Sequence, residues 1–229
     1  AICENARASD KKGFLFRGDN PNNLVVDFLP ILLSFGGWVI DEANRPTVNT
    51  PEFKSAMEFY LKLIATGEAQ VKDDLIASVD TGAGTMGIGW PGWYTPTADS
   101  TADYIALSGA ASAGAQAYNS NVYGIWTIGV PNNSQNKDLA VKLLAYLMDA
   151  DVQKSTVASG GVPCRYSSLQ DADVLAAYPQ YEVVCKALES GMYRPVIAEW
   201  TQFYTILGTE MDNIVNGVKT VDQGLADAQ

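Results

Sequence analysis

Three large aromatic rings, Trp90, Trp93 and Tyr94, stand close together in the stretch GTMGIGWPGWYTP at residues 84–96. Glycine and proline residues separate the rings, and this composition is typical of a loop. Loops lie on protein surfaces, where a large ring is usually covered by the core or by a ligand. The flat face of such a ring suits the apolar C–H face of a sugar, so this loop is a candidate stacking site.

Polar groups that can hydrogen-bond hydroxyls stand at other loops and helix starts. Asn22–Asn23 open one predicted helix, and Glu199–Trp200 open another. Gly160–Gly161 end a predicted helix shortly before Arg165, where backbone N–H groups and a guanidinium are available. Each feature also has a structural interpretation, because asparagine caps helices and a tryptophan on a helical stripe more often belongs to the core. We treat them as candidates for binding an uncharged polar ligand.

Catalysis and metal binding have little support in the sequence. The chain contains no histidine, which excludes histidine-based triads, and it has no CxxC spacing, which removes most zinc sites. Carboxylates such as Asp27, Asp41, Glu42 and Glu199 could serve glycoside hydrolysis in pairs, but 26 acidic residues make chance pairs common. We expect no catalytic residue, no metal and no cofactor, and keep a glycoside hydrolase that uses Asp27 or Glu199 as the enzyme alternative.

The cysteines leave two interpretations open. Cys164 and Cys185 could form a disulfide in an oxidising compartment, or could be two buried thiols. Their spacing alone does not decide between these states.

Charge and hydropathy exclude two classes of partner. The formal net charge is −11, and basic residues are scattered, so nucleic acid and anionic membrane surfaces are disfavoured. No apolar stretch reaches the roughly 18 residues that a membrane span needs. A hydrophobic content of 47% is ordinary for a globular protein long enough to bury a core.

Helical periodicity predicts most of the elements that must position these residues. The clearest helix starts at Thr50-Pro51-Glu52, a cap, a proline and an acid, and runs to Gly67. Trp126 and Trp38 are expected in the core or at the edge of a cleft. The other predicted helices lie at about 24–35, 72–79, 137–147, 151–160, 173–190 (interrupted near 179), 198–215 and 220–228. The predicted strands lie at 14–17, 86–88, 104–107 and 123–130, the last one buried, which together indicates α/β layers.

Four stretches, taken in order, resemble the extracellular solute-binding proteins of sugar ABC importers, of the maltose-binding-protein-like group. They are LPILLSFGGWVIDEANRPTVNTPEFKSAMEFYLKLI, GTMGIGWPGWY, GVPNNSQNKDLAVKLLAYLMDADVQKSTVASGGVPCRYSSL and YRPVIAEWTQFYTILGTEMDNIVNGVKTVDQGLADAQ. The resemblance covers nearly the whole chain and implies an α/β fold of the type II periplasmic-binding-protein class. It implies mainly the C-terminal lobe, with residues 1–67 as its first part and 109–229 as its second. Residues 68–108 would cross the hinge into part of the N-terminal lobe.

The resemblance also bears on the start of the chain. AICENARASDKKG shows no charged leader followed by an apolar block, and it reads as the end of a helix closed by Gly13. Because members of the family are considerably longer, we expect a chain that lacks most of the N-terminal lobe.

The same resemblance implies a set of ligand contacts. The aromatic loop holds a stacking ring in relatives, with Trp93 as first choice and Trp90 as second. The start of the helix at NLVVDFLP faces the cleft, which adds Asn22, Asn23 and Asp27. The last long helix and the GGVPCR loop supply Trp200, Tyr204, Gly161 and Arg165. Glu199, at the start of the same helix, is a candidate from the residues alone.

The implied function is binding of a mono- or oligosaccharide or polyol in an interlobe cleft, without catalysis, and delivery to the permease subunits of an ABC importer. A monomer without nucleic acid is expected, located outside the cytoplasm in a periplasm or on a lipid anchor. A non-transport interaction module remains the second alternative, with the aromatic loop buried in a protein contact.

Overall fold

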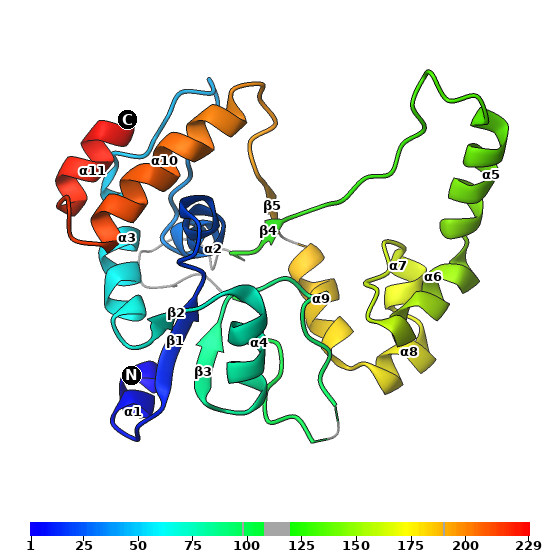
Figure 1. Cartoon of the computed structure of the whole chain (residues 1–229), viewed down its shortest axis with the longest axis horizontal. Coiled ribbons are helices and arrows are strands. Elements are labelled where there is room, and N and C mark those ends of the chain that lie inside the picture. The colour runs from blue at the N-terminus through cyan, green and yellow to red at the C-terminus, as the bar shows by residue number, and fades with distance from the viewer. Residues whose placement is uncertain (98, 108–119, 190) are drawn as a thin grey trace.

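The computed structural model describes residues 1–97, 99–107, 120–189 and 191–229 (Figure 1). Helices predominate and short strands lie between some of them, so the chain has the predicted mixed α/β composition. None of the helices in the described residues is long and apolar enough to cross a membrane. The elements are α1 (Ile2–Arg7), β1 (Lys12–Phe16), α2 (Pro21–Ser34), α3 (Pro51–Ile64), β2 (Glu68–Ala69), α4 (Lys72–Asp80), β3 (Gly84–Gly87), β4 (Val122–Tyr123), α5 (Lys137–Leu147), α6 (Ala150–Thr156), the 3₁₀ turn η2 (Val157–Ser159), α7 (Tyr166–Leu169), α8 (Ala172–Ala177), α9 (Gln180–Leu188), β5 (Met192–Tyr193), α10 (Trp200–Val215) and α11 (Val221–Ala228).

A three-stranded parallel sheet organises the first part of the chain. β1 lies in the centre, with β2 on one side and β3 on the other. Phe14 pairs with Met86 of β3, and Leu15 pairs with both Glu68 of β2 and Gly87 of β3. Because the strands are parallel, the segments that follow β1 and β3 emerge at the same edge. That edge receives the residues after Phe16 and the aromatic loop after Gly87.

The main hydrophobic core lies between this sheet and the helices α2, α3, α10 and α11. Phe28 of α2 contacts Phe53 and Tyr60 of α3 at ring-centroid distances of 5.3 and 5.6 Å. Both helices begin at side-chain caps, since Asn20 accepts from the Asn22 N–H and Thr50 accepts from the Phe53 N–H. Burial of one apolar face of each helix then fixes α2 and α3 against β1.

A glycine allows α10 to cross the start of α2 closely. A Cβ added at Gly208 would lie 2.9 Å from the Pro21 carbonyl oxygen and 3.1 Å from Asn22 Oδ1. Such distances are tighter than packed side chains tolerate, so a larger residue would push the two helices apart. Tyr204, one turn earlier in α10, is thereby brought to the end of α2 that carries the candidate asparagines.

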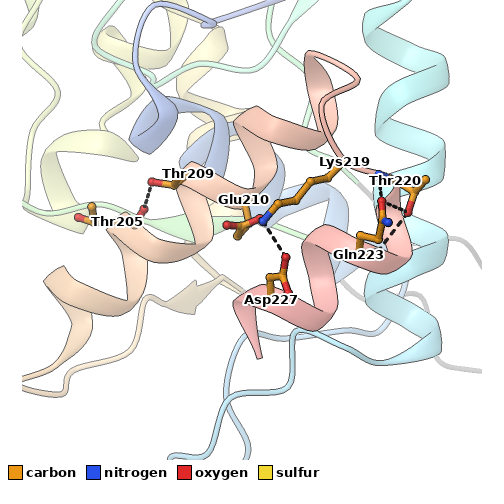
Figure 2. Close-up of polar contacts among 7 residues, drawn as sticks. All are labelled: Thr205, Thr209, Glu210, Lys219, Thr220, Gln223 and Asp227. Atoms are coloured by element: carbon orange, nitrogen blue, oxygen red, sulfur yellow. Dashed lines mark hydrogen bonds and ion pairs between the residues drawn. The ribbon is translucent and has the colours of Figure 1, made fainter.

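The C-terminal hairpin α10–α11 is held by a polar network that Figure 2 shows. Lys219 Nζ lies 2.6 Å from Glu210 Oε2 and 2.7 Å from Asp227 Oδ2, so it joins the two helices. At the start of α11, Thr220 and Gln223 form the predicted capping box, each side chain bonding the other residue's backbone N–H. This network holds the C-terminal half of α10 against α11.

A second, smaller cluster of buried side chains lies in the segment from η2 to α9. Its members are Val157, Leu169, Val174, Tyr181, Val184 and Cys185. In Figure 1 the helices α5, α6, α7 and α8 stand apart from the sheet and the helices of the main core, whereas α9 lies nearer to β4, whose Tyr123 hydroxyl donates to the Leu188 carbonyl oxygen. The predicted lobe boundaries at residues 67 and 108 stay a prediction. The strands between them, β2 and β3, share one sheet with β1, which precedes them.

The predicted buried strand at residues 123–130 is wrong. Only Val122–Tyr123 forms a strand, β4, which pairs in parallel with β5. Ile125 is 64% exposed, Ile128 72% and Trp126 fully exposed, so Trp126 is not a core residue. Apolar composition predicts a need for burial, but the described residues leave these three side chains largely uncovered. Trp38, by contrast, is partly buried against the main core.

Two further sequence expectations are settled. Residues 104–107 form no strand. The three cysteines are free thiols, with Cys164 exposed and Cys3 and Cys185 buried. The disulfide alternative is therefore wrong for Cys164 and Cys185, and the buried-thiol alternative holds only for Cys185.

We expect Thr220→Ala to lower the free energy of unfolding by about 1 kcal/mol, because it removes the cap of α11. Chemical denaturation measures this loss. Thr209→Ala is the matched control, since the Thr209 hydroxyl donates to the Thr205 carbonyl inside α10 and caps nothing (Figure 2). Equal effects of the two substitutions would contradict the role of the capping box.

Candidate ligand-binding site

The candidate site lies at the carboxyl edge of the parallel sheet. Arg17 directly follows β1, and the aromatic loop follows β3. The start of α2, with Asn22 and Asn23, is only a few residues beyond Arg17 in the chain. Strand topology and a short turn therefore bring a cation, two amides and the rings to one edge.

Arg17 makes a planar set of hydrogen bonds to α2. Its Nε donates to Asp27 Oδ2 at 3.1 Å, its Nη2 donates to Asp27 Oδ1, and its Nη1 donates to Asn23 Oδ1 at 3.0 Å. Asn23 Nδ2 in turn donates to Asp19 Oδ1 at 3.1 Å. Arg17 is 9% exposed and Asp27 2% exposed, so this is a buried, side-on ion pair.

Two opposing effects act on the Asp27 carboxyl. Burial raises the pKa of Asp27, and the hydrogen bonds and positive charge of Arg17 oppose that rise. Both carboxylate oxygens accept from Arg17, so Asp27 offers no oxygen to solvent. The pair as a whole has no net charge.

Trp93 packs its indole over this pair. The Arg17 Cζ lies 4.8 Å from the centroid of the Trp93 ring, within the range of a cation–π contact. The backbone of Gly89 passes beside the same ring, because a Cβ there would lie 3.0 Å from Trp93 Cε3. Trp93 is half-buried, so the guanidinium covers part of the ring and solvent reaches the rest.

Tyr104 anchors the aromatic loop. Its hydroxyl donates to the Tyr94 carbonyl oxygen at 2.8 Å and accepts from the Tyr94 N–H at 3.1 Å. Trp90 turns elsewhere, since a Cβ added at Gly124 would lie 2.4 Å from Trp90 Cη2. Trp90 therefore packs beside the segment after β4, whereas Trp93 faces Arg17.

The start of α10 completes this edge with aromatic side chains. Trp200 stacks on Phe203 at 5.6 Å and contacts Tyr204 at 5.5 Å between ring centroids. Burial raises the pKa of Tyr204, and the charges of Arg194 and Arg17 counteract it. Tyr204 thus lies close enough to Arg17 for the positive charge of Arg17 to act on the Tyr204 phenol.

Residues 1–154 match the family described as bacterial extracellular solute-binding protein. This chain belongs to that family. Its members are binding proteins rather than enzymes, so the hydrolase alternative loses its basis.

Curated relatives of this solute-binding protein support the assignment. A protein of Sinorhizobium fredii named "Probable amino-acid ABC transporter periplasmic-binding protein" is 25% identical over 89% of this chain and 48% of its own length. A "Probable ABC transporter-binding protein" of Deinococcus radiodurans is 26% identical over 83% of this chain and 48% of its own length. The chain therefore spans about half the length of these relatives.

Solved structures confirm the predicted fold class. Maltose-bound MalE3 of T. maritima superposes with a TM-score of 0.81 at 21% identity, over 99% of this chain and 62% of that one. A ribitol complex from Agrobacterium radiobacter K84 gives 0.83 at 20% identity, over 99% and 61%. A D-mannitol complex from Agrobacterium vitis S4 gives 0.78 at 21% identity, over 99% and 62%. The solute-binding protein thus has the type II periplasmic-binding-protein fold.

Not all predicted contact residues of this solute-binding protein meet at the sheet edge. Arg165 is exposed, and its Nη1 donates to the Met148 carbonyl at 3.0 Å, beside α6. Glu199 is exposed and lines a different hollow of about 220 Å³, together with Gln202 and Phe203. We therefore place neither side chain in the candidate site.

Gly161 lies in a loop that neighbours the candidate site. Its carbonyl oxygen accepts from the Tyr181 hydroxyl at 3.1 Å. The next residue, Val162, approaches the aromatic loop, since a Cβ on Gly92 would lie 3.5 Å from Val162 Cγ2. The loop that contains Gly161 thus lies beside the aromatic loop.

Arg17 is the residue that sequence reasoning missed. The only available signal was an arginine directly after an apolar strand, FLFR, followed ten residues later by an acid on an otherwise apolar helix. A buried acid requires a partner, so Asp27 among Val25, Phe28 and Leu29 indicated a buried cation nearby.

We expect Tyr104→Phe to loosen the aromatic loop, because the hydroxyl that bonds Tyr94 is lost. We also expect the free energy of unfolding to depend less on pH above about pH 10, because the phenol is lost. Burial raises the pKa of Tyr104 to about 12. Because this lies above the ordinary value near 10, the contribution of Tyr104 to stability is full below pH 10 and is lost as pH rises to about 12. Denaturation between pH 8 and pH 12 measures the slope. Tyr193→Phe, which changes an exposed tyrosine, should leave that slope unchanged.

Proposed function

We propose that this chain binds a neutral polyhydroxylated ligand, a sugar or polyol, and delivers it to the permease of an ABC importer outside the cytoplasmic membrane. The observation that supports this most is the half-buried Trp93 ring, seated on a guanidinium whose charge Asp27 already neutralises. Such a site offers a flat apolar face together with polar groups of no net charge. A sugar ring has the matching pair of surfaces.

The proposed contacts are those gathered at the sheet edge. Trp93 stacks on the ligand, and Asn22 and Asn23 at the start of α2 bond its hydroxyls. Tyr204 and Trp200 of α10 close the aromatic side. Asp27 acts through Arg17, because neither of its oxygens is free. Trp90 and Gly161 contribute from the neighbouring loops.

The solved neighbours agree with this ligand class. Their titles name maltose, ribitol and D-mannitol as the molecules bound. All three are uncharged and polyhydroxylated. At about 20% identity these structures show the fold alone, so the ligand class of this chain rests on the chemistry of its own site.

A second candidate ligand is an amino acid. The Sinorhizobium fredii relative is named for amino-acid transport. In addition, Arg194 lies close enough to Tyr204 for its charge to lower the pKa of that phenol. The α-carboxylate of an amino acid would require a cation such as Arg194, because Arg17, the cation beside Trp93, is already paired with Asp27.

Delivery follows from the behaviour expected of a two-lobed binding protein. Ligand that contacts both lobes shifts the equilibrium towards a closed form, which a permease recognises. Because the chain spans 61 to 62% of the solved neighbours, this step is proposed for the complete protein. We propose that it acts as a monomer, in a periplasm or on a lipid anchor.

Titration of the protein with ribitol, D-mannitol, maltose, alanine and glutamate tests the ligand class, with intrinsic tryptophan fluorescence and calorimetry as readouts. Saturable binding of a polyol or sugar, but not of the amino acids, supports the proposal. Binding of an amino acid alone would overturn it in favour of the second candidate. Absence of saturable binding across the panel would favour the interaction module.

We expect Trp93→Ala to weaken binding of the responding sugar or polyol by about 1–3 kcal/mol, because one stacked ring face is lost. The free energy of unfolding should change far less than for a core tryptophan. Trp126→Ala is the matched control, because this indole is fully exposed outside the site. Unchanged affinity in Trp93→Ala would remove the ring from the site.

A further inference from the structure

Hydrogen bonds that lie in the plane of the Arg17 guanidinium fix the orientation of this group. Nε and Nη2 donate to the two oxygens of Asp27, and Nη1 donates to Asn23. These bonds leave the flat faces of the guanidinium without a hydrogen-bonding role, because its N–H groups all lie in the plane. Asp27 and Asn23 fix the guanidinium, so they also fix the position of a ring that packs on one of its faces.

The backbone around Trp93 belongs to no regular element that would orient its ring. It lies in a stretch of glycine and proline residues that belongs to no helix or strand. The backbone N–H of Trp93 donates to the Trp90 carbonyl oxygen at 2.9 Å, which sets a turn in the main chain but does not fix the side chain. The indole is contacted by the Arg17 guanidinium, whose Cζ lies 4.8 Å from the ring centroid, and by the Gly89 backbone.

We infer that Arg17 is a positioning residue, which holds the Trp93 indole in the orientation that receives the ligand. The inference concerns ring geometry and rests on the proposed function only for its effect on affinity. A stacking surface that is already oriented binds more tightly than one that must be ordered by the ligand. Arg17 touches the ring and contributes to binding through it.

Lysine cannot replace Arg17 in this role. Its ammonium is a compact point charge without a plane, so it can neutralise Asp27 but cannot present a flat face to the indole. Arg17→Lys thus keeps the buried charge pair and removes the stacking surface. Arg45→Lys is the matched control, since Arg45 also pairs with a carboxylate, Asp41, but is largely exposed and bonds no residue of the site among the described contacts.

The experiment labels the protein with 5-fluorotryptophan and records ¹⁹F NMR spectra. The five tryptophans give separate probes, and the Trp93 signal is assigned by its loss in Trp93→Phe. We expect Arg17→Lys to shift or broaden the Trp93 signal while the Trp38, Trp126 and Trp200 signals stay in place. Affinity for the responding sugar or polyol should fall about 3- to 30-fold, the range for a lost cation–π contact.

The spectra separate this inference from the proposed function. An unchanged Trp93 signal in Arg17→Lys overturns the positioning role, whether or not the protein binds a polyol. A moved Trp93 signal with unchanged polyol affinity overturns its importance for binding. A moved signal in a protein that binds no polyol retains the positioning role and rejects the proposed function.

A second variant covers the case in which Arg17→Lys does not fold. Arg17→Gln with Asp27→Asn removes both charges together, so no unpaired ion is left in the interior. The same displacement of the Trp93 signal is expected, and an undisturbed signal would overturn the inference. Arg45→Lys should leave all five signals and the affinity unchanged.

Discussion

The structure of the candidate site depends on one buried ion pair, Arg17 with Asp27. Removing two such ions from water costs several kcal/mol each, and only close geometry and complete hydrogen bonding offset that cost. Both oxygens of Asp27 accept from Arg17, and Arg17 donates through Nε and Nη2 to Asp27 and through Nη1 to Asn23. Because breaking the pair would leave a charge in the interior, the end of β1, the start of α2 and the Trp93 ring are held in one arrangement.

Parallel strand order explains why this arrangement forms at the sheet edge. β1 and β3 run in the same direction, so Arg17 and the aromatic loop leave the sheet side by side. The close crossing of α10 over α2 at Gly208 then adds Tyr204 to the same place. Three segments distant in sequence meet there without any one of them having a distinctive motif.

Sequence reasoning succeeded where the causes are local. Thr50 and Thr220 cap helices through residues three positions away, and the structure has both caps. It failed at Trp126, because burial of an apolar segment depends on what packs against it, and the described residues leave Trp126 fully exposed. Arg17 escaped notice for a related reason, since its pairing with Asp27 requires the turn between β1 and α2 to be known. The fold class followed from motif order, whereas the contacts within the site did not.

Charge on two length scales favours a neutral ligand. Within a few ångströms of Trp93, the cation is cancelled by Asp27, so an anion gains little from Arg17. Over the whole chain the net charge is −11, which repels anions at distances up to a Debye length of about 8 Å at physiological salt. An uncharged polyol would meet neither penalty, because ring stacking and hydrogen bonds do not depend on net charge. Only a cation outside the pair, such as Arg194, would make a carboxylate competitive at this edge.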